Sequence, residues 1–218
     1  MKMPALYYAT FVVESGVCTF GICRFKKLSK ALQVLVGLIL VWLIAEIIEY
    51  LTNQRNINNV WIAHINNVIE MVFFIMIYYF WRTSEHNGKI LLSSLIIFIT
   101  IWIVGKFTFE PFSGADETTW ALSRLIQICV GVNFLLALLK KEMMIPILKN
   151  PKLITTSAFI IYSTGTFFLF SLFTPLLNVS IELTRRFYYI NWILIIITQL
   201  LYARAIWCSG TTSDLQNQ

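Results

Sequence analysis

The sequence predicts an all-α membrane protein, a bundle of seven transmembrane helices with the N-terminus outside and the C-terminus in the cytoplasm. Three observations support this fold class: the composition, the length of the apolar segments, and the distribution of Lys and Arg between them. Of the 218 residues, 58% are hydrophobic and 13% are charged, and the mean hydropathy is +0.73. Soluble domains carry about 25% charged residues, so the surface of this chain suits lipid rather than water.

Seven segments have the length of about 20 apolar residues that a helix needs to cross the hydrocarbon core of a bilayer. We place them at 4–23, 31–51, 60–81, 89–109, 119–140, 153–175 and 186–207. Glu14 interrupts the first segment, while Pro111, Pro151 and Pro175 lie at the expected ends of others. The connections are short, which predicts antiparallel neighbours in a single membrane domain over residues 1–218.

Lys and Arg are distributed unequally between the two sides of this bundle. Eleven lie on one side: Arg24, Lys26, Lys27, Lys30, Arg82, Lys89, Lys140, Lys141, Lys149, Lys152 and Arg204. Four lie on the other side: Lys2, Arg55, Arg185 and Arg186. Cytoplasmic loops are enriched in Lys and Arg, so the side with eleven is predicted to be cytoplasmic. Because the basic residues occupy loops between apolar segments, we expect the lipid bilayer, and no nucleic acid, as a partner.

Polar and charged side chains gather in the outer halves of the predicted helices. A charged side chain inside a bilayer costs at least ~2.5 kcal/mol on insertion scales, so each one requires a partner or a function. Most of these residues recur at spacings of three or four, which places them on one face of their helix. We therefore expect an outward-facing polar pocket, with these candidate ligand-binding residues: Glu46, Glu49, His64, Asn67, Glu70, Arg124, Gln127 and Asn191.

Two other interpretations of the same residues stay open. In the first, the polar groups only join helices through buried ion pairs and hydrogen bonds, as in a structural subunit of a membrane complex. In the second, the protein is an intramembrane metal-dependent lipid hydrolase, with His64, Glu46 and Glu70 as candidate metal ligands. The Glu-x-x-His pairs typical of carboxylate-bridged metal sites in helix bundles are absent from the sequence.

No sequence motif assigns catalytic residues or a cofactor. A glycine-rich phosphate loop, H-E-x-x-H and G-x-S-x-G are all absent. An outward polar pocket in a small helix bundle favours a sensor or accessory protein over an enzyme. Such a sensor is expected to signal through a partner protein.

Several motifs in the chain also resemble a known group of proteins. The third segment has a W-x-x-H-x-x-x-x-x-E pattern and the sixth follows an Asn-Pro pair with Y-x-x-G-x-x-x-x-F; the residues are Trp61, His64, Glu70, Asn150, Pro151, Tyr162, Gly165 and Phe170. These motifs resemble uncharacterised short bacterial seven-helix membrane proteins, which are often encoded beside sensor histidine kinases. The resemblance implies a sensing or accessory role in the bacterial cytoplasmic membrane, with such a kinase or another membrane protein as partner. No activity is established for that group, so the resemblance assigns no catalytic residue.

Overall fold

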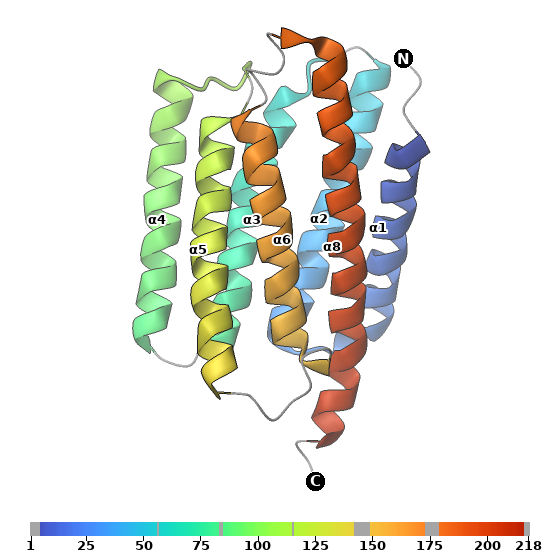
Figure 1. Cartoon of the computed structure of the whole chain (residues 1–218), viewed down its shortest axis with the longest axis vertical. Coiled ribbons are helices and arrows are strands. Elements are labelled where there is room, and N and C mark those ends of the chain that lie inside the picture. The colour runs from blue at the N-terminus through green and yellow to red at the C-terminus, as the bar shows by residue number, and fades with distance from the viewer. Residues whose placement is uncertain are drawn as a thin grey trace.

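The computed structural model describes residues 5–55, 57–82, 85–114, 116–141, 149–172 and 179–215. Within these ranges the chain is helical and contains no strand: α1 (Ala5–Arg24), a 3-10 turn η1 (Phe25–Lys27), α2 (Lys30–Gln54), α3 (Val60–Trp81), α4 (Glu85–Thr108), α5 (Thr118–Lys141), α6 (Pro151–Ser171) and α8 (Ile181–Leu215) (Figure 1). Seven helices are long and apolar enough to cross a membrane. This confirms the predicted class of an all-α integral membrane protein.

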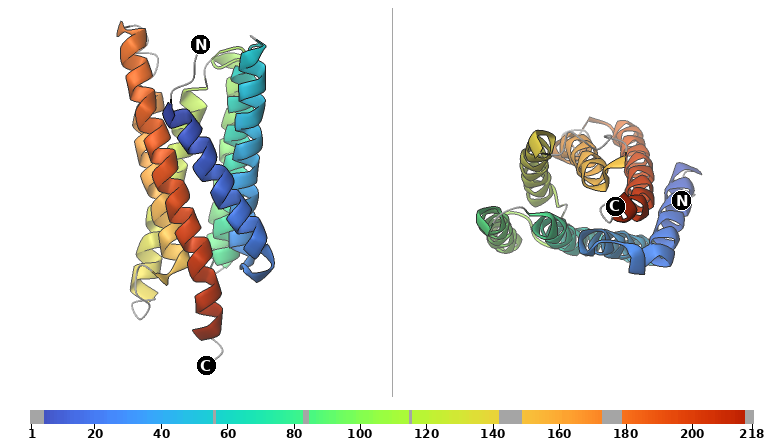
Figure 2. Two further views of the ribbon diagram at one scale, coloured as in Figure 1. Left: turned by 90° about the vertical axis from the view of Figure 1, so that its right-hand side faces the viewer. Right: turned by 90° about the horizontal axis from the view of Figure 1, so that it is seen from below.

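Six of the helices form a closed ring, and α4 lies outside it. Around the ring, α1 packs on α2, α2 on α3, α3 on α5, α5 on α6, α6 on α8, and α8 on α1. α4 packs only against α3 and α5 among the stronger helix pairs. Viewed along the bundle, the row from α2 to α4 faces α5, α6 and α8, and α1 closes one side (Figure 2). The six helices of the ring therefore surround a common interior, and α4 packs against the ring at α3 and α5.

The predicted helix ends agree closely with the structure except in the last helix. The third segment, 60–81, coincides with α3, and the ends of the first six differ from the structure by at most four residues. α8 begins five residues earlier and ends eight residues later than the predicted 186–207. The residues at both ends of α8 are polar, so hydropathy does not identify them as part of the helix, although their backbone is helical. The predicted end of the sixth segment at Pro175 lies outside the described residues.

Asn150 fixes the start of α6 and explains the Asn-Pro pair. Its Oδ1 accepts hydrogen bonds from the backbone N–H groups of Lys152 at 3.0 Å and of Leu153 at 3.4 Å. Asn is among the best residues for this position, because its side chain satisfies N–H groups that have no partner within the helix. Pro151 occupies the first helical turn, where its missing N–H costs nothing.

An aromatic core fills the ring in the half away from the start of α1. The ring centroids of Phe74 and Phe159 lie 5.0 Å apart, and those of Phe159 and Tyr202 lie 5.4 Å apart. All three side chains are fully buried. Above them, Trp42 stacks on Tyr202 at 6.3 Å and contacts Tyr162 at 6.0 Å. Trp42 and Tyr162 thus separate the apolar core from the polar half of the ring.

Candidate functional site

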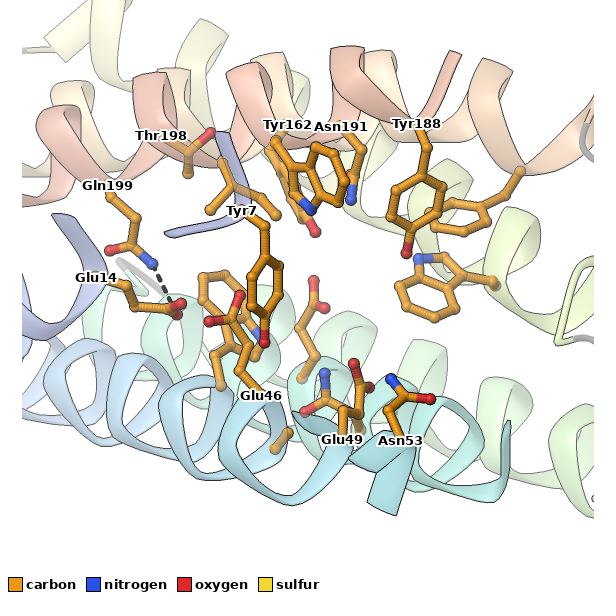
Figure 3. Close-up of a pocket in the computed structure, with 18 residues that line it drawn as sticks. Tyr7, Glu14, Glu46, Glu49, Asn53, Tyr162, Tyr188, Asn191, Thr198 and Gln199 are labelled. Carbon is orange, nitrogen blue, oxygen red and sulfur yellow. Dashed lines mark hydrogen bonds between the residues drawn. The ribbon is translucent and has the colours of Figure 1, made fainter. Parts of the chain in front are cut away.

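A pocket of about 310 Å³ lies inside the ring, in the half of the bundle where α1 begins (Figure 3). Its lining comes from α1, α2, α3, α5, α6 and α8, the six helices of the ring. Trp42 and Tyr162 lie on the side of the pocket toward the aromatic core. The remaining lining is a mixture of carboxyl, amide and aromatic side chains, so the pocket can take a molecule with both polar and apolar parts.

Glu46 and Glu49 form the acidic wall of the pocket. They lie one helical turn apart on α2, and Figure 3 shows them with Asn53, opposite Tyr188 and Asn191 of α8. Both glutamates are half-buried. Within the described ranges, neither carboxyl group has a basic partner, and Oε2 of Glu46 has no hydrogen-bond partner. These two carboxyl groups are therefore available to a ligand.

Glu14 extends the acidic wall onto α1. Its side chain is 2% exposed and lines the pocket close to Glu46, with which it interacts electrostatically. Nε2 of Gln199 in α8 donates a hydrogen bond to Oε1 of Glu14 at 3.1 Å. Neither residue belonged to the predicted ligand-binding set. The signal for both was their polarity within otherwise apolar segments.

Glu70 also lines the pocket but has a partner of opposite charge. Two guanidinium nitrogens of Arg124 donate hydrogen bonds to the carboxylate of Glu70. One contacts Oε1, and the other contacts Oε2 at 2.9 Å. Gln127 donates to Oε1 of Glu70 at 3.1 Å and accepts from Ser163 at 2.6 Å. The guanidinium also lies 4.9 Å from the ring centre of Tyr162. This network, which we call the ion-pair network, joins α3, α5 and α6.

His64 and Asn67 lie outside the pocket, where α3 meets the connection between α4 and α5. Nε2 of His64 lies 3.0 Å from the carbonyl oxygen of Gly114, and its Nδ1 contacts Nζ of Lys106. Nδ2 of Asn67 donates to Oδ2 of Asp116 at 3.1 Å, and Lys106 binds Oδ1 of the same carboxylate at 3.2 Å. We call this group, together with Glu110 and Thr119, the loop cluster.

Glu110 anchors the start of α5 within the loop cluster. Its carboxylate accepts hydrogen bonds from the backbone N–H of Thr118 at 2.6 Å and of Thr119 at 3.2 Å. Burial alone would raise the pKa of Glu110, but these bonds and the Thr119 hydroxyl favour the carboxylate and lower it. For Asp116, burial raises the pKa despite contacts with Thr119, Lys106 and His64. The loop cluster thus stabilises a helix start and a connection.

The structure divides the predicted ligand-binding set into three groups. Glu46, Glu49, Glu70 and Asn191 line the pocket. The others do not: Arg124 and Gln127 bind Glu70 beside it, while His64 and Asn67 belong to the loop cluster. Sequence reasoning missed the aromatic lining, because Tyr and Trp near helix ends are also expected at membrane interfaces.

The candidate metal ligands do not come together. Glu70 is bound by Arg124, Glu46 lies in the pocket, and His64 lies in the loop cluster. Among the described residues, no group of three or more His, Cys, Asp and Glu side chains is arranged to hold a metal ion. The geometry therefore gives no support to the metal-dependent hydrolase.

No protein-family model, curated protein or solved structure matches the chain. The pocket, the ion-pair network and the loop cluster are accordingly the basis for assigning a function.

Proposed function

We propose that the chain is a membrane sensor or accessory protein, which binds a ligand in the pocket between its helices and signals through a partner. One observation carries this proposal: Glu46 and Glu49 line the pocket without a basic partner among the described residues. Ionisable groups within membrane helices destabilise the protein unless they are paired, and they commonly mark functional sites. A residue that only joined helices would be paired, as Glu70 is with Arg124.

The orientation and the partner are part of the same proposal. The excess of Lys and Arg on one side favours an N-terminus outside, so the pocket would face the exterior of a bacterial cytoplasmic membrane. The described residues are membrane helices and short connections. A signal would therefore have to pass to another protein, and the resemblance to chains encoded beside sensor histidine kinases makes such a kinase the first candidate.

Accessibility of the pocket to water is the first test. In a variant in which Ser replaces all four cysteines, Ala45→Cys places a thiol in the pocket lining, and Ile44→Cys places one on the outer face, where Ile44 is 47% exposed. We expect membrane-impermeant methanethiosulfonates, added outside intact cells, to modify Cys at position 45 but not at position 44. If neither an anionic nor a cationic reagent modifies position 45, the pocket is closed to solution and the proposal fails.

Signalling is tested by comparing two Glu→Gln variants in cells. Glu49→Gln removes a charge from the pocket, whereas Glu85→Gln removes one from an exposed site at the start of α4. We expect deletion of the chain to change a set of transcripts, Glu49→Gln to reproduce that change, and Glu85→Gln to behave as wild type. The three proteins must be present in equal amounts in the membrane. A wild-type response from Glu49→Gln would favour the structural subunit instead.

A further inference from the structure

The charge of the pocket restricts the kind of ligand that it can bind. Glu14, Glu46 and Glu49 line it, and Glu70 is already neutralised by Arg124. No Lys, Arg or His side chain is among the lining residues. An anionic ligand would find no positively charged side chain in this lining, and any ionised carboxyl group there would repel it strongly in a medium of low dielectric constant. A cationic ligand would supply the charge that the pocket lacks.

The aromatic lining provides a second surface for a cation. Figure 3 shows Tyr7 and Tyr188 reaching into the pocket from α1 and α8, facing the wall that carries Glu46 and Glu49. The ring of Trp192, which also lines the pocket, lies 6.2 Å from Tyr7 and 5.5 Å from Tyr188, centre to centre. The faces of Trp and Tyr rings attract ammonium groups, most strongly when the groups are shielded from water.

Asn191 gives an observation that is independent of the acidic wall. Its side chain is 7% exposed and points into the pocket (Figure 3), and its Oδ1 has no hydrogen-bond partner. A buried acceptor without a partner destabilises a protein, because it has lost its hydrogen bond to water without gaining another. An N–H or O–H group of a ligand would satisfy it. Oε2 of Glu46 is a second buried acceptor without a partner in the same lining.

The size of the pocket distinguishes an organic cation from an inorganic one. Its volume of about 310 Å³ falls within the range of about 300–1,000 Å³ typical of small-molecule sites. A single metal ion would fill little of that space. It would also need several converging oxygen ligands, and the described residues offer no such group of three.

We propose that the pocket binds a small organic ammonium ion. Its nitrogen would lie against the carboxylates of Glu46 and Glu49, and its apolar substituents would lie against the rings of Tyr188 and Trp192. A further hydroxyl or amine of the ligand would donate to Asn191. This inference rests on the proposed function, since it requires a pocket that is open to a ligand.

Binding to matched probes tests the inference. The purified full chain in detergent is titrated with choline and with its neutral isostere 3,3-dimethylbutan-1-ol, then with propylamine, propan-1-ol and propionate, by calorimetry and tryptophan fluorescence. We expect at least one ammonium probe to bind at least tenfold more tightly than its neutral counterpart. Glu46→Gln with Glu49→Gln should weaken that binding at least tenfold, and Glu85→Gln should leave it unchanged.

The aromatic contribution is measured with Trp192. Trp192→Leu should weaken binding of the ammonium probe about fivefold, while Trp192→Phe, which retains an aromatic face, should lose less. Circular dichroism and size-exclusion chromatography establish that each variant is folded. If the double Gln variant is misfolded, the half-buried single variant Glu49→Gln replaces it.

The outcomes separate this inference from the proposed function. Equal affinity for charged and neutral probes, or full affinity in the Gln variant, would overturn the ammonium ligand and leave the pocket as a site for another molecule. If no probe binds but Ala45→Cys is still modified by the thiol reagents, the ammonium ligand is again wrong and the open pocket remains. If no probe binds and no thiol reagent reacts, both proposals fail.

Discussion

The ion-pair network and the acidic wall of the pocket lie in the same half of the bundle, but they differ in whether their carboxyl groups have a basic partner. In the network, Arg124 faces the carboxylate of Glu70, and Gln127 satisfies the same group. In the acidic wall, Glu46 and Glu49 face the pocket without a cation among the described residues. The comparison shows that the environment of a carboxyl group in a membrane helix depends on whether a neighbouring helix provides a basic side chain.

The geometry of each region fits its role. Arg124 is fully buried and binds Glu70 through two nitrogens, an arrangement that fixes the relative position of α3 and α5. Glu46 and Glu49 are half-buried beside open volume. The network therefore joins helices of the ring, while the wall presents carboxyl groups without a basic partner to the pocket.

The largest expected effect comes from breaking the ion-pair network. Arg124→Met should lower the free energy of unfolding by about 3–5 kcal/mol, because it leaves the buried carboxylate of Glu70 without its partner. The Glu70→Met, Arg124→Met double variant should recover most of the loss, since it removes both charges. Thermal unfolding in detergent provides the measurement. A double variant as unstable as Arg124→Met would show that the network contributes more than the pairing of these charges.

An intermediate effect is expected in the loop cluster as pH changes. The lowered pKa of Glu110 means that its contribution to stability is present above about pH 4.3 and is lost as pH falls through the lowered pKa. The raised pKa of Asp116 acts in the opposite sense: its contribution is present at low pH and is lost as pH rises through the raised pKa. In the wild type, the two carboxyl groups therefore make opposite contributions to the pH dependence of stability.

Separate variants should reveal these two opposing contributions. Asp116→Asn removes the contribution of Asp116 and keeps the hydrogen bonds from Thr118 and Thr119 that lower the pKa of Glu110, so stability should fall on acidification from pH 5 to pH 3. Glu110→Gln leaves only Asp116, so stability should rise as pH is lowered from 7 to 4. Other carboxyl groups contribute equally to both proteins, and the difference between the two melting curves isolates the loop cluster. Parallel curves at all pH values would contradict the assignment.

The smallest effect is expected for Glu→Gln in the acidic wall. The same substitution in the ion-pair network allows a direct comparison of the two regions. Glu49→Gln should raise the free energy of unfolding by about 1 kcal/mol, because it replaces a half-buried ionisable group that has no basic partner among the described residues. Glu70→Gln should lower it, because it removes half of an ion pair. Melting temperatures measured side by side give the two signs. A loss of stability in both variants would mean that Glu49 has a structural role.

The helices could be predicted because hydropathy reports directly on burial in lipid. The third segment, 60–81, coincides with α3 for that reason. The extension of α8 to Ile181–Leu215 could not be predicted in the same way. Polar residues near both termini of α8 mark the limits of its apolar segment, but the backbone hydrogen bonds of the helix continue through them.

The polar residues could be predicted as a group but not sorted into roles. Spacing along one helix places Glu46 beside Glu49 and His64 beside Asn67. It gives no information about which residue of another helix lies opposite. Lys106 of α4 meets His64 because α4 packs on α3, and it meets Asp116 because the connection before α5 lies against both helices. Such contacts depend on the packing of the ring, which the sequence pattern of a single helix does not contain.

The length of α8 has a mechanical consequence. At 35 residues and 1.5 Å per residue it is about 52 Å long, well beyond the ~30 Å of the hydrocarbon core. One part of it carries Tyr188 and Asn191 in the pocket lining, and its far end extends past the other helices (Figure 1). Because a continuous helix is stiff, a tilt of about 5° around the pocket would displace that far end by roughly 3 Å. α8 therefore connects the pocket lining, through one rigid element, to a segment that projects beyond the opposite end of the bundle.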